Sequence, residues 1–252
     1  ISHNIANVNT TGYKAKTANF SSLLVQHIDN LSNGDEGAPR LTPDGIRQGN
    51  GARLAHSNIN MSQGTLVRTD RALDVALTGD HHFFQVQVTE NGETETQFTR
   101  AGNFYLQPIN NNEQTMLVTS EGHPVIGTNG PIIFQGEIDD IQIRNNGEIV
   151  VTRGNVENVE ATLEIVEINL PRSLESVGGS RLRFPNEAYG MAENAVATIV
   201  GNAEVVPGSL ESSNVNLSEA LTSLIETQRA YQFNARSITI GDQMMGLINQ
   251  LR

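Results

Sequence analysis

The chain has 252 residues, of which 37% are hydrophobic and 17% charged, and its formal net charge is -12. This length can bury a sizeable core in one large β domain, or in one or two domains with extensions. The acidity excludes the basic surface that a phosphate backbone requires, no apolar run approaches the length of a membrane span, and the lack of cysteine excludes disulfides, thiol nucleophiles and cysteine-ligated metals.

The first residues predict the tail of a helix that ends near Asn7. Asn and Thr favour caps and turns, and Gly12 can adopt the left-handed conformation that closes a helix. Residues 14–28 carry apolar side chains at helical spacing and predict a short helical or extended stretch. The stretch 29–53 is rich in glycine, holds two prolines and has few apolar residues, which predicts a loop or flexible arm.

Short strand patterns run from residue 57 to residue 206. Residues 83–88 alternate after the first phenylalanine, and residues 163–170 are rich in β-branched residues. Two apolar runs flank Asn146-Gly147, which predicts a hairpin whose Asn-Gly pair supplies the positive φ of a tight turn. We therefore expect a mainly β middle region built of short strands, as a sandwich or in a barrel-like arrangement.

A long helix is predicted from Leu217 to about Leu251. Asn216-Leu217-Ser218-Glu219 has the form of a capping box, in which the Asn side chain accepts from the helix amides and Glu219 bonds back to the Asn216 amide. A helix of about 34 residues is about 50 Å long. One alternative is an amphipathic helix packed on its own domain, but a single β domain seldom offers a groove of that length.

Apolar residues recur along this helix at spacings of four, three and seven, which is a heptad pattern. The polar residues Gln228 and Asp242 occupy two positions of the pattern, where they could fix the register. The predicted subunit-interface residues are Leu217, Leu221, Leu224, Ile225, Gln228, Tyr231, Ala235, Ile238, Met245 and Ile248. Ile225, Met244, Ile248 and Leu251 widen the stripe.

Signals for chemistry are weak. His81 and His82 are adjacent, and neighbours on a strand point to opposite faces, so they cannot chelate one ion together. We expect no cofactor, no metal site and no catalysis. One alternative is a secreted, carbohydrate-active β protein that uses Asp139 and Asp140, since a glycosidase holds two carboxyls across a cleft. Another is a ligand-binding module that uses the aromatic side chains near Phe83 together with the two histidines.

The motifs, in order, resemble those of the bacterial flagellar basal-body rod and hook protein family. The resemblance begins with the run Asn4 to Lys14, continues through the blocks at 64–86, 98–104 and 117–122, and ends with 208–216 and 226–231. Within the family the length is most similar to that of the distal-rod protein and its paralogues. The family-motif residues are Asn4, Ala6, Asn7, Asn9, Gly12, Tyr13, Asp74, Gly79, Phe84, Arg100, Gly102, Phe104, Gly122, Asn214, Asn216 and Arg229.

The resemblance implies a structural subunit of the rod or hook axial tube that polymerises through terminal helices and transmits torque in motility. It implies export through the flagellar apparatus without a cleaved signal, location in the basal body outside the cytoplasmic membrane, and contacts with copies of itself and with neighbouring rod and hook proteins. The family's N-terminal helix normally starts well upstream of Asn4. We therefore expect the C-terminal helix to pack onto another copy, to fold back on its own β domain, or to be poorly ordered.

Four segments are expected. Residues 1–13 form the end of an N-terminal assembly helix and its turn, and residues 14–56 an extended arm or linker. Residues 57–206 form the β-rich middle, and residues 207–252 the C-terminal assembly helix.

Overall fold

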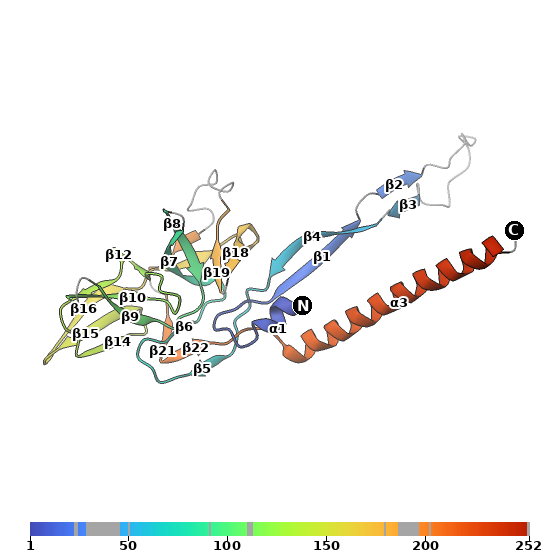
Figure 1. The fold of residues 1–252 in the computed structure, drawn as a ribbon. Coiled ribbons are helices and arrows are strands. Elements are labelled where there is room, and N and C mark those ends of the chain that lie inside the picture. The colour runs from blue at the N-terminus through green and yellow to red at the C-terminus, as the bar shows by residue number, and fades with distance from the viewer. Residues whose placement is uncertain are drawn as a thin grey trace, which may run out of the picture. The chain divides into compact units, whose positions relative to one another are not determined.

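A computed structural model describes residues 1–22, 25–28, 46–49, 51–90, 92–109, 113–178, 180–185, 197–201 and 203–250. The chain divides into two compact units. One consists of Ile1–Ala15 with Asn60–Arg252, and the other is Lys16–Ile59. Figure 1 shows the course of the chain within each unit.

The second unit is made of antiparallel strand pairs. β1 (Lys16–Ser22) pairs with β4 (Ala52–Ile59), and β2 (Val25–Ile28) pairs with β3 (Ile46–Gly49). Residues 14–28 are therefore extended where they are described, so the short helix is wrong there. Residues 46–49 and 52–53 are paired strands, so a loop is wrong there. Residues 29–45 lie outside the described residues. The predicted limits of the arm remain a prediction.

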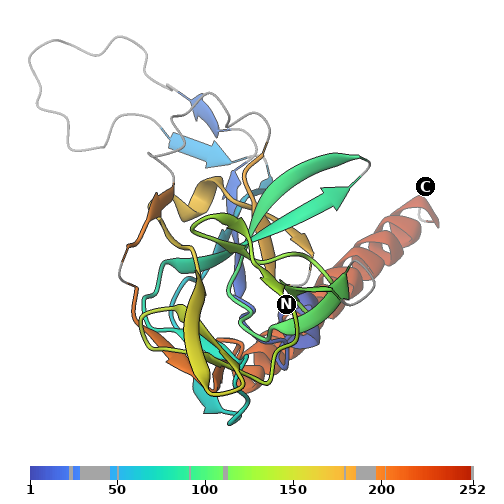
Figure 2. The same cartoon turned by 90° about the vertical axis from the view of Figure 1, so that its left-hand side faces the viewer.

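The β-rich part of the first unit consists of several small sheets, not one continuous layer (Figures 1 and 2). The largest has the strand order β18-β19-β8-β7-β17-β20. Its members are β7 (His82–Glu90), β8 (Glu93–Thr99), β17 (Ile165–Ile168), β18 (Glu175–Gly178), β19 (Arg181–Arg183) and β20 (Ala197–Ile199), and the short 3-10 helix η2 (Pro171–Ser173) precedes β18.

Two three-stranded sheets and three strand pairs complete this part. The three-stranded sheets are β13-β10-β9 and β14-β15-β16; the pairs are β11-β12, β21-β6 and β22-β5. The strands are β5 (Leu66–Arg68), β6 (Val75–Leu77), β9 (Tyr105–Ile109), β10 (Gln114–Val118), β11 (Ile126–Gly127), β12 (Gly130–Pro131), β13 (Ile133–Gln135), β14 (Asp140–Ile143), β15 (Glu148–Arg153), β16 (Val156–Thr162), β21 (Val205–Pro207) and β22 (Ser209–Glu211).

One hydrophobic core joins these sheets. Phe84, Phe104, Phe134 and Ile149 are fully buried in it. On β7 the buried side chains alternate as the sequence predicts, because successive residues of a strand point to opposite faces. The mainly β fold class is confirmed, and in the part of the chain that the structure describes none of the sheets closes into a barrel.

The predicted hairpin between β14 and β15 is confirmed, with a different turn. Gly147 has φ +80°, and its amide donates to the Arg144 carbonyl at 2.9 Å. Among described residues other than glycine only Asp70 has a positive φ, so Asn146 does not share this role. The connection is therefore longer than a two-residue turn and places one left-handed glycine before β15.

The two helices lie at opposite ends of the chain and contact each other. α1 (Ser2–Ala6) ends where the Asn-rich pattern predicts, and α3 (Leu217–Gln250) is one continuous helix. Figure 1 shows α1 beside the first turns of α3. The large apolar side chains of α3 are 37% to 76% exposed, so the expectation that it folds back on the β domain is wrong. Packing onto another copy stays a prediction.

Candidate functional site

A buried carboxylate joins the two ends of the chain to the β-rich part. Glu211, the last residue of β22, accepts from Lys14 Nζ at 2.8 Å, from the Gly64 amide at 2.7 Å and from Arg100 Nε at 2.6 Å. The exposed fraction of the Glu211 side chain is 1%, and those of Lys14 and Arg100 are 4% and 0%. We call this cluster, with Gly12, Tyr13 and Asn214 around it, the junction.

Both cations of the junction also donate to backbone carbonyls. Lys14 Nζ donates to the Ser62 carbonyl at 2.7 Å and to that of Met61 at 3.3 Å. Arg100 Nη1 donates to the carbonyls of Asp80 and His82, at 2.6 and 2.9 Å. Burial lowers the pKa of Lys14, the charge of Arg100 lowers it further, and Glu211 opposes both effects. The cluster therefore fixes five chain segments through charged hydrogen bonds away from water.

Asn214 holds the two points at which the chain enters and leaves the Lys16–Ile59 unit. Its side-chain oxygen accepts from the Ala15 amide at 2.7 Å, and its nitrogen donates to the Asn60 and Ser62 carbonyls, both at 2.9 Å. The Asn60 amide also donates to the Ala15 carbonyl at 2.8 Å. One amide side chain thus connects Ala15, Asn60 and the segment just before α3.

The N-terminal motif packs against the junction through Gly12 and Tyr13. The Gly12 amide donates to the Glu211 carbonyl at 2.8 Å, with φ at +67°. A Cβ at this position would lie 2.5 Å from the Arg100 carbonyl carbon, so the contact requires glycine. Tyr13 is 2% exposed, and its hydroxyl lies 3.0 Å from Asn4 Oδ1 and 2.8 Å from His3 Nδ1. This ties α1 to the turn that follows it.

The other N-terminal motif residues lie in or just after α1. Asn7 is its C-cap residue and donates through Nδ2 to the His3 carbonyl at 2.8 Å. Ala6 and Asn9 are exposed.

Motif residues of the β-rich part support the core or its turns. Phe84 and Phe104 meet edge to face at 5.1 Å, and Asp74 accepts from the Thr69 hydroxyl at 2.7 Å. A Cβ on Gly102 would lie 1.8 Å from the Val75 carbonyl oxygen, so this backbone approach requires glycine. The two remaining motif glycines lie in connections between strands. Gly79 is beside the His82 ring, and Gly122 is in an open turn with φ +84°. None of these six belongs to the junction.

Asn216 begins α3 as the sequence predicts. Its Oδ1 accepts from the Ser218 amide at 3.1 Å and from the Glu219 amide at 3.3 Å. In the part of the chain that the structure describes, no hydrogen bond joins the Glu219 carboxylate to the Asn216 amide, so the capping box is only half formed. Glu219 still lies in the first turn, where a negative charge favours the helix. Arg229 is exposed on the helix surface.

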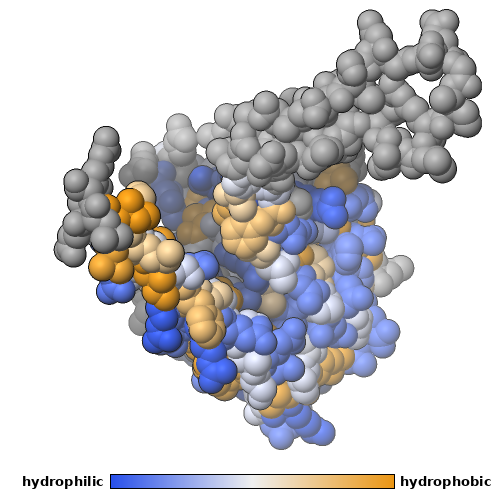
Figure 3. Space-filling model, turned by 90° about the vertical axis from the view of Figure 1, so that its right-hand side faces the viewer, coloured by the Kyte–Doolittle hydropathy of each residue, from blue (hydrophilic) through white to orange (hydrophobic). Residues whose placement is uncertain are grey.

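The predicted interface residues lie along α3 and are exposed. α1 contacts α3, and farther along the helix Tyr231 and Ile238 are 76% and 73% exposed. Figure 3 looks toward the C-terminal end of the helix and shows orange, apolar side chains gathered there. The heptad residues Leu217, Leu221, Leu224, Tyr231, Ala235, Ile238 and Met245 share one side, which we call the front face.

Met244 lies on the flank of the front face, and its role in widening the apolar stripe stays a prediction; Leu251 lies outside the described residues. Successive residues of an α-helix are about 100° apart, which places Met244 that far from Met245. Ile248 likewise lies off the front face, about 60° beyond Met245. Ile225 and Gln228 lie on or beside the front face.

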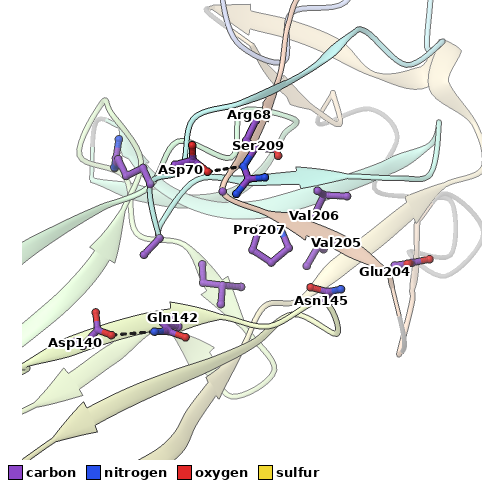
Figure 4. A pocket seen from close by; sticks show the side chains of 14 residues that line it. Arg68, Asp70, Asp140, Gln142, Asn145, Glu204, Val205, Val206, Pro207 and Ser209 are labelled. Carbon is purple, nitrogen blue, oxygen red and sulfur yellow. Dashed lines mark hydrogen bonds and ion pairs between the residues drawn. The ribbon is translucent and has the colours of Figure 1, made fainter.

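A cavity of about 620 Å³ lies between β14, the β5–β6 connection and β21 (Figure 4). Two side-chain pairs in its lining hold their charges by hydrogen bonds (Figure 4). Arg68 Nε donates to Asp70 Oδ1 at 2.5 Å, and Gln142 Nε2 donates to Asp140 Oδ2 at 3.0 Å. Asp139 accepts from the Gly154 amide at 2.6 Å and does not line the cavity. The two carboxyls proposed for glycan chemistry are therefore not held together across a cleft.

The aromatic and histidine platform is mostly core. Phe83 and Phe84 are 1% and 0% exposed, so their rings are unavailable to a ligand. His81 Nδ1 lies 3.2 Å from the Ile168 carbonyl, and burial lowers the pKa of His82. In the described ranges no group of three or more His, Asp or Glu side chains could hold a metal ion, and no helix there is long and apolar enough to cross a membrane.

The sequence did not predict that two residues of the junction, Lys14 and Glu211, are buried together. Lys14 and Glu211 lie within the motif blocks, yet they are 197 positions apart and neither neighbourhood predicts burial of a charge. The composition could have pointed to Lys14 as a special residue, because the sequence holds only two lysines, Lys14 and Lys16, and both lie beside the Asn-rich motif.

Comparison with known proteins identifies the family to which the chain belongs. Residues 76–151 match a family described as the flagellar hook protein FlgE/F/G D1 domain, and residues 206–251 match one described as the flagellar basal body rod FlgEFG protein C-terminal region. The flagellar hook-basal body complex protein FlhP of Bacillus subtilis is 40% identical over 256 residues, which cover all of this chain and 92% of that protein. The chain belongs to the flagellar basal-body rod and hook protein family.

Other relatives agree with this assignment. The flagellar basal-body rod protein FlgG of Buchnera aphidicola from Acyrthosiphon pisum is 34% identical over all of this chain and 92% of its own length, and FlgG of Caulobacter vibrioides is 32% identical with the same coverage. The chain is thus a structural axial subunit of the flagellum, as its motifs predict. The alternative of a secreted ligand-binding or carbohydrate-active protein is not supported.

Proposed function

We propose that this subunit polymerises into the rod or hook tube through the front face of α3, and that the junction carries torque between the helices and the β-rich part. The observation that carries the proposal is the exposed front face on a helix that the junction anchors. Leu221, Leu224 and Tyr231 are 42%, 37% and 76% exposed. An exposed apolar stripe of this length favours a partner that covers it.

The junction supports the torque-transmitting role by its position. Glu211 lies six residues before α3, and Lys14 lies eight residues after α1. A load on either helix therefore reaches the β-rich part through Glu211, Lys14 and Arg100. Charged, buried hydrogen bonds fix one geometry there, whereas an apolar contact would allow sliding.

The finer features of the role belong to the same proposal. The neighbours are copies of this chain and other rod or hook proteins, the distal rod is the expected position, and export proceeds through the flagellar apparatus without a cleaved signal. The subunit acts outside the cytoplasmic membrane, takes no cofactor and catalyses no reaction. The names of its relatives, which describe rod and hook-basal body proteins, support this assignment.

The test is Leu224→Asp in the full protein, expressed in its own bacterium. We expect loss of motility and of assembled axial structures, with the β-rich part still folded, because an unpaired carboxylate would be buried in the front-face contact. Thr222→Asp is the matched control. It adds the same charge two residues away, on the opposite side of the helix, and should leave motility intact. A motile Leu224→Asp strain would refute the proposal.

A further inference from the structure

A proline keeps β14 and β21 apart and so creates the cleft between them. The strands meet just past the end of β14, where the Val205 amide donates to the Asn145 carbonyl at 2.8 Å. β14 runs toward this bond and β21 away from it, so a continued antiparallel ladder would next place the amide of residue 207 against the Ile143 carbonyl. Residue 207 is Pro207, which has no N–H. The ladder stops after one bond, and the strands diverge around the cavity of about 620 Å³ (Figure 4).

The free edge of β14 faces this cleft. β14 is the outer strand of its sheet, and Ile143 lines the cavity. Residues of an antiparallel strand alternately turn their backbone groups toward the paired strand and away from it. The Arg144 amide donates to the Glu148 carbonyl on β15 at 2.9 Å, which fixes this alternation. The amides and carbonyls of Ile141 and Ile143 therefore point away from β15, toward the free edge.

These backbone groups lack a partner within the chain as far as the structure describes it. No hydrogen bond of the described residues outside the β14–β15 ladder uses the amide or carbonyl of Ile141 or Ile143. The two residues are nevertheless only 7% and 5% exposed. Because buried backbone groups are nearly always paired, the edge favours a partner that supplies hydrogen bonds.

The charges of the cleft favour a basic partner. Each of the two arginines in its lining forms an ion pair with an aspartate. Among the described residues no cation pairs with Asp140 or Glu204. These two carboxylates lie at opposite ends of the cleft (Figure 4). Basic side chains that reach both ends would complement their charge.

We infer that the cleft binds a short, basic, extended segment of another protein, which adds to β14 as an antiparallel strand. The residues of that segment opposite Ile141 and Ile143 make the backbone bonds and turn apolar side chains inward. Their neighbours along the segment face water and bring basic side chains to Asp140 and Glu204. Asp140 lies five residues before Asn145, where the cleft closes. A strand advances about 3.3 Å per residue, so a segment of about five residues spans the cleft.

The probe for this inference is the peptide acetyl-Lys-Val-Lys-Val-Lys-amide, added to the purified full protein in its monomeric form. Its two valines stand opposite Ile141 and Ile143, and its outer lysines reach the two carboxylates. We expect binding to slow hydrogen exchange at the Ile141 and Ile143 amides. Fluorescence anisotropy of a labelled peptide gives the affinity.

Methylation of the peptide backbone tests the strand pairing itself. N-methyl groups on both valines should weaken binding about tenfold or more, because the valine amides face β14 and each contributes a hydrogen bond. The matched control carries one N-methyl group on the central lysine, whose amide faces away from β14, and should bind as the parent peptide does. Equal weakening by the two modifications would overturn strand addition.

Variants of the protein test the charges and the proline. Asp140→Asn and Glu204→Gln should each weaken binding about two- to fivefold, as expected for exposed ion pairs. Asp139→Asn, next to the cleft but not in its lining, is the control and should bind normally. Pro207→Ala supplies the missing amide. The ladder can then close onto Ile143, so the new amide should exchange slowly and the peptide should no longer bind, while thermal unfolding shows that the variant is folded.

Three results would refute the inference. One is the absence of binding at millimolar peptide, and another is binding that leaves exchange at Ile141 and Ile143 unchanged. The third is protection of these amides without peptide as the protein concentration rises, because a second copy would then cover β14. The cleft shares no residue with the junction or the front face, so each result is independent of the Leu224→Asp test.

Discussion

Replacing Glu211 by Gln tests the junction most directly. The substitution keeps the size of the side chain and removes its charge. The carboxylate is the acidic partner of both Lys14 and Arg100, and all three side chains are at most 4% exposed. The variant therefore leaves two buried cations facing each other with no acidic partner in the cluster.

The expected loss of stability follows from that burial. Removal of one partner from a buried ion pair costs about 3–5 kcal/mol, and the upper part of that range applies here because two cations lose their partner. A native domain has about 5–15 kcal/mol in total. At about 2–4 °C per kcal/mol for a chain of this size, a loss of about 4–5 kcal/mol should lower the midpoint of thermal unfolding by roughly 8–20 °C.

Two measurements check this prediction. Urea unfolding, followed by tyrosine fluorescence because the chain has no tryptophan, gives the change in free energy of unfolding. Hydrogen exchange gives the local effect. The Gly64 amide donates to the Glu211 carboxylate and the Gly12 amide to the Glu211 backbone carbonyl, so both amides should exchange faster when the junction is weakened. Glu204→Gln, at an exposed position of the same unit, is the control and should behave as the wild type. A loss below about 1 kcal/mol in Glu211→Gln would refute the reasoning, because surface pairs contribute that little.

Three further predictions concern neighbouring residues. Gly12→Ala should lower the free energy of unfolding in urea by about 3 kcal/mol or more, because a Cβ there would lie 2.5 Å from backbone atoms. Gly154→Ala is the control: its φ of +62° is similar but a Cβ there meets open space, so the loss should be only about 1–2 kcal/mol. Asn214→Ala should cost about 1–3 kcal/mol and accelerate exchange of the Ala15 amide, and normal protection of that amide would contradict the assigned bond. Burial holds the pKa of His82 below its usual value of about 6.5. The neutral His82 side chain therefore contributes its full stability above about pH 6.5, and this contribution is lost as the pH falls toward the pKa of the folded state. Urea unfolding across this pH range should show a loss of stability that His82→Asn lacks.

Local features of the fold were predictable because their causes are local. Asn216 caps α3 by accepting from the Ser218 and Glu219 amides, and Gly147 turns the β14–β15 hairpin through its own φ. The alternation of buried residues along β7 follows from the geometry of a strand. In each case the residues that form the element and the residues that predict it are the same few neighbours.

The junction and the sheet order were not predictable on this basis. Arg100 and Glu211 are 111 positions apart, and only the folded chain brings the guanidinium to the carboxylate. A charged residue in a sequence predicts exposure unless its partner is known. The strand order β18-β19-β8-β7-β17-β20 mixes distant segments for the same reason. For β1 the sequence left a helix and an extended stretch open, and it did not predict the pairing with β4, because these strands pair with little apolar patterning; Phe20, opposite Leu54, is 72% exposed.

Apolar side chains and charged side chains have different tasks in this subunit. The front face of α3 can be covered and uncovered, because its large apolar side chains are exposed. The junction cannot open without leaving Glu211, Lys14 or Arg100 buried and unpaired, which is costly. The front face is thus the surface that binds a neighbouring subunit, and the junction is the contact that must stay closed when that subunit applies a load. Exchange protection of the Gly12 and Gly64 amides should therefore persist in a variant such as Leu224→Asp that no longer assembles.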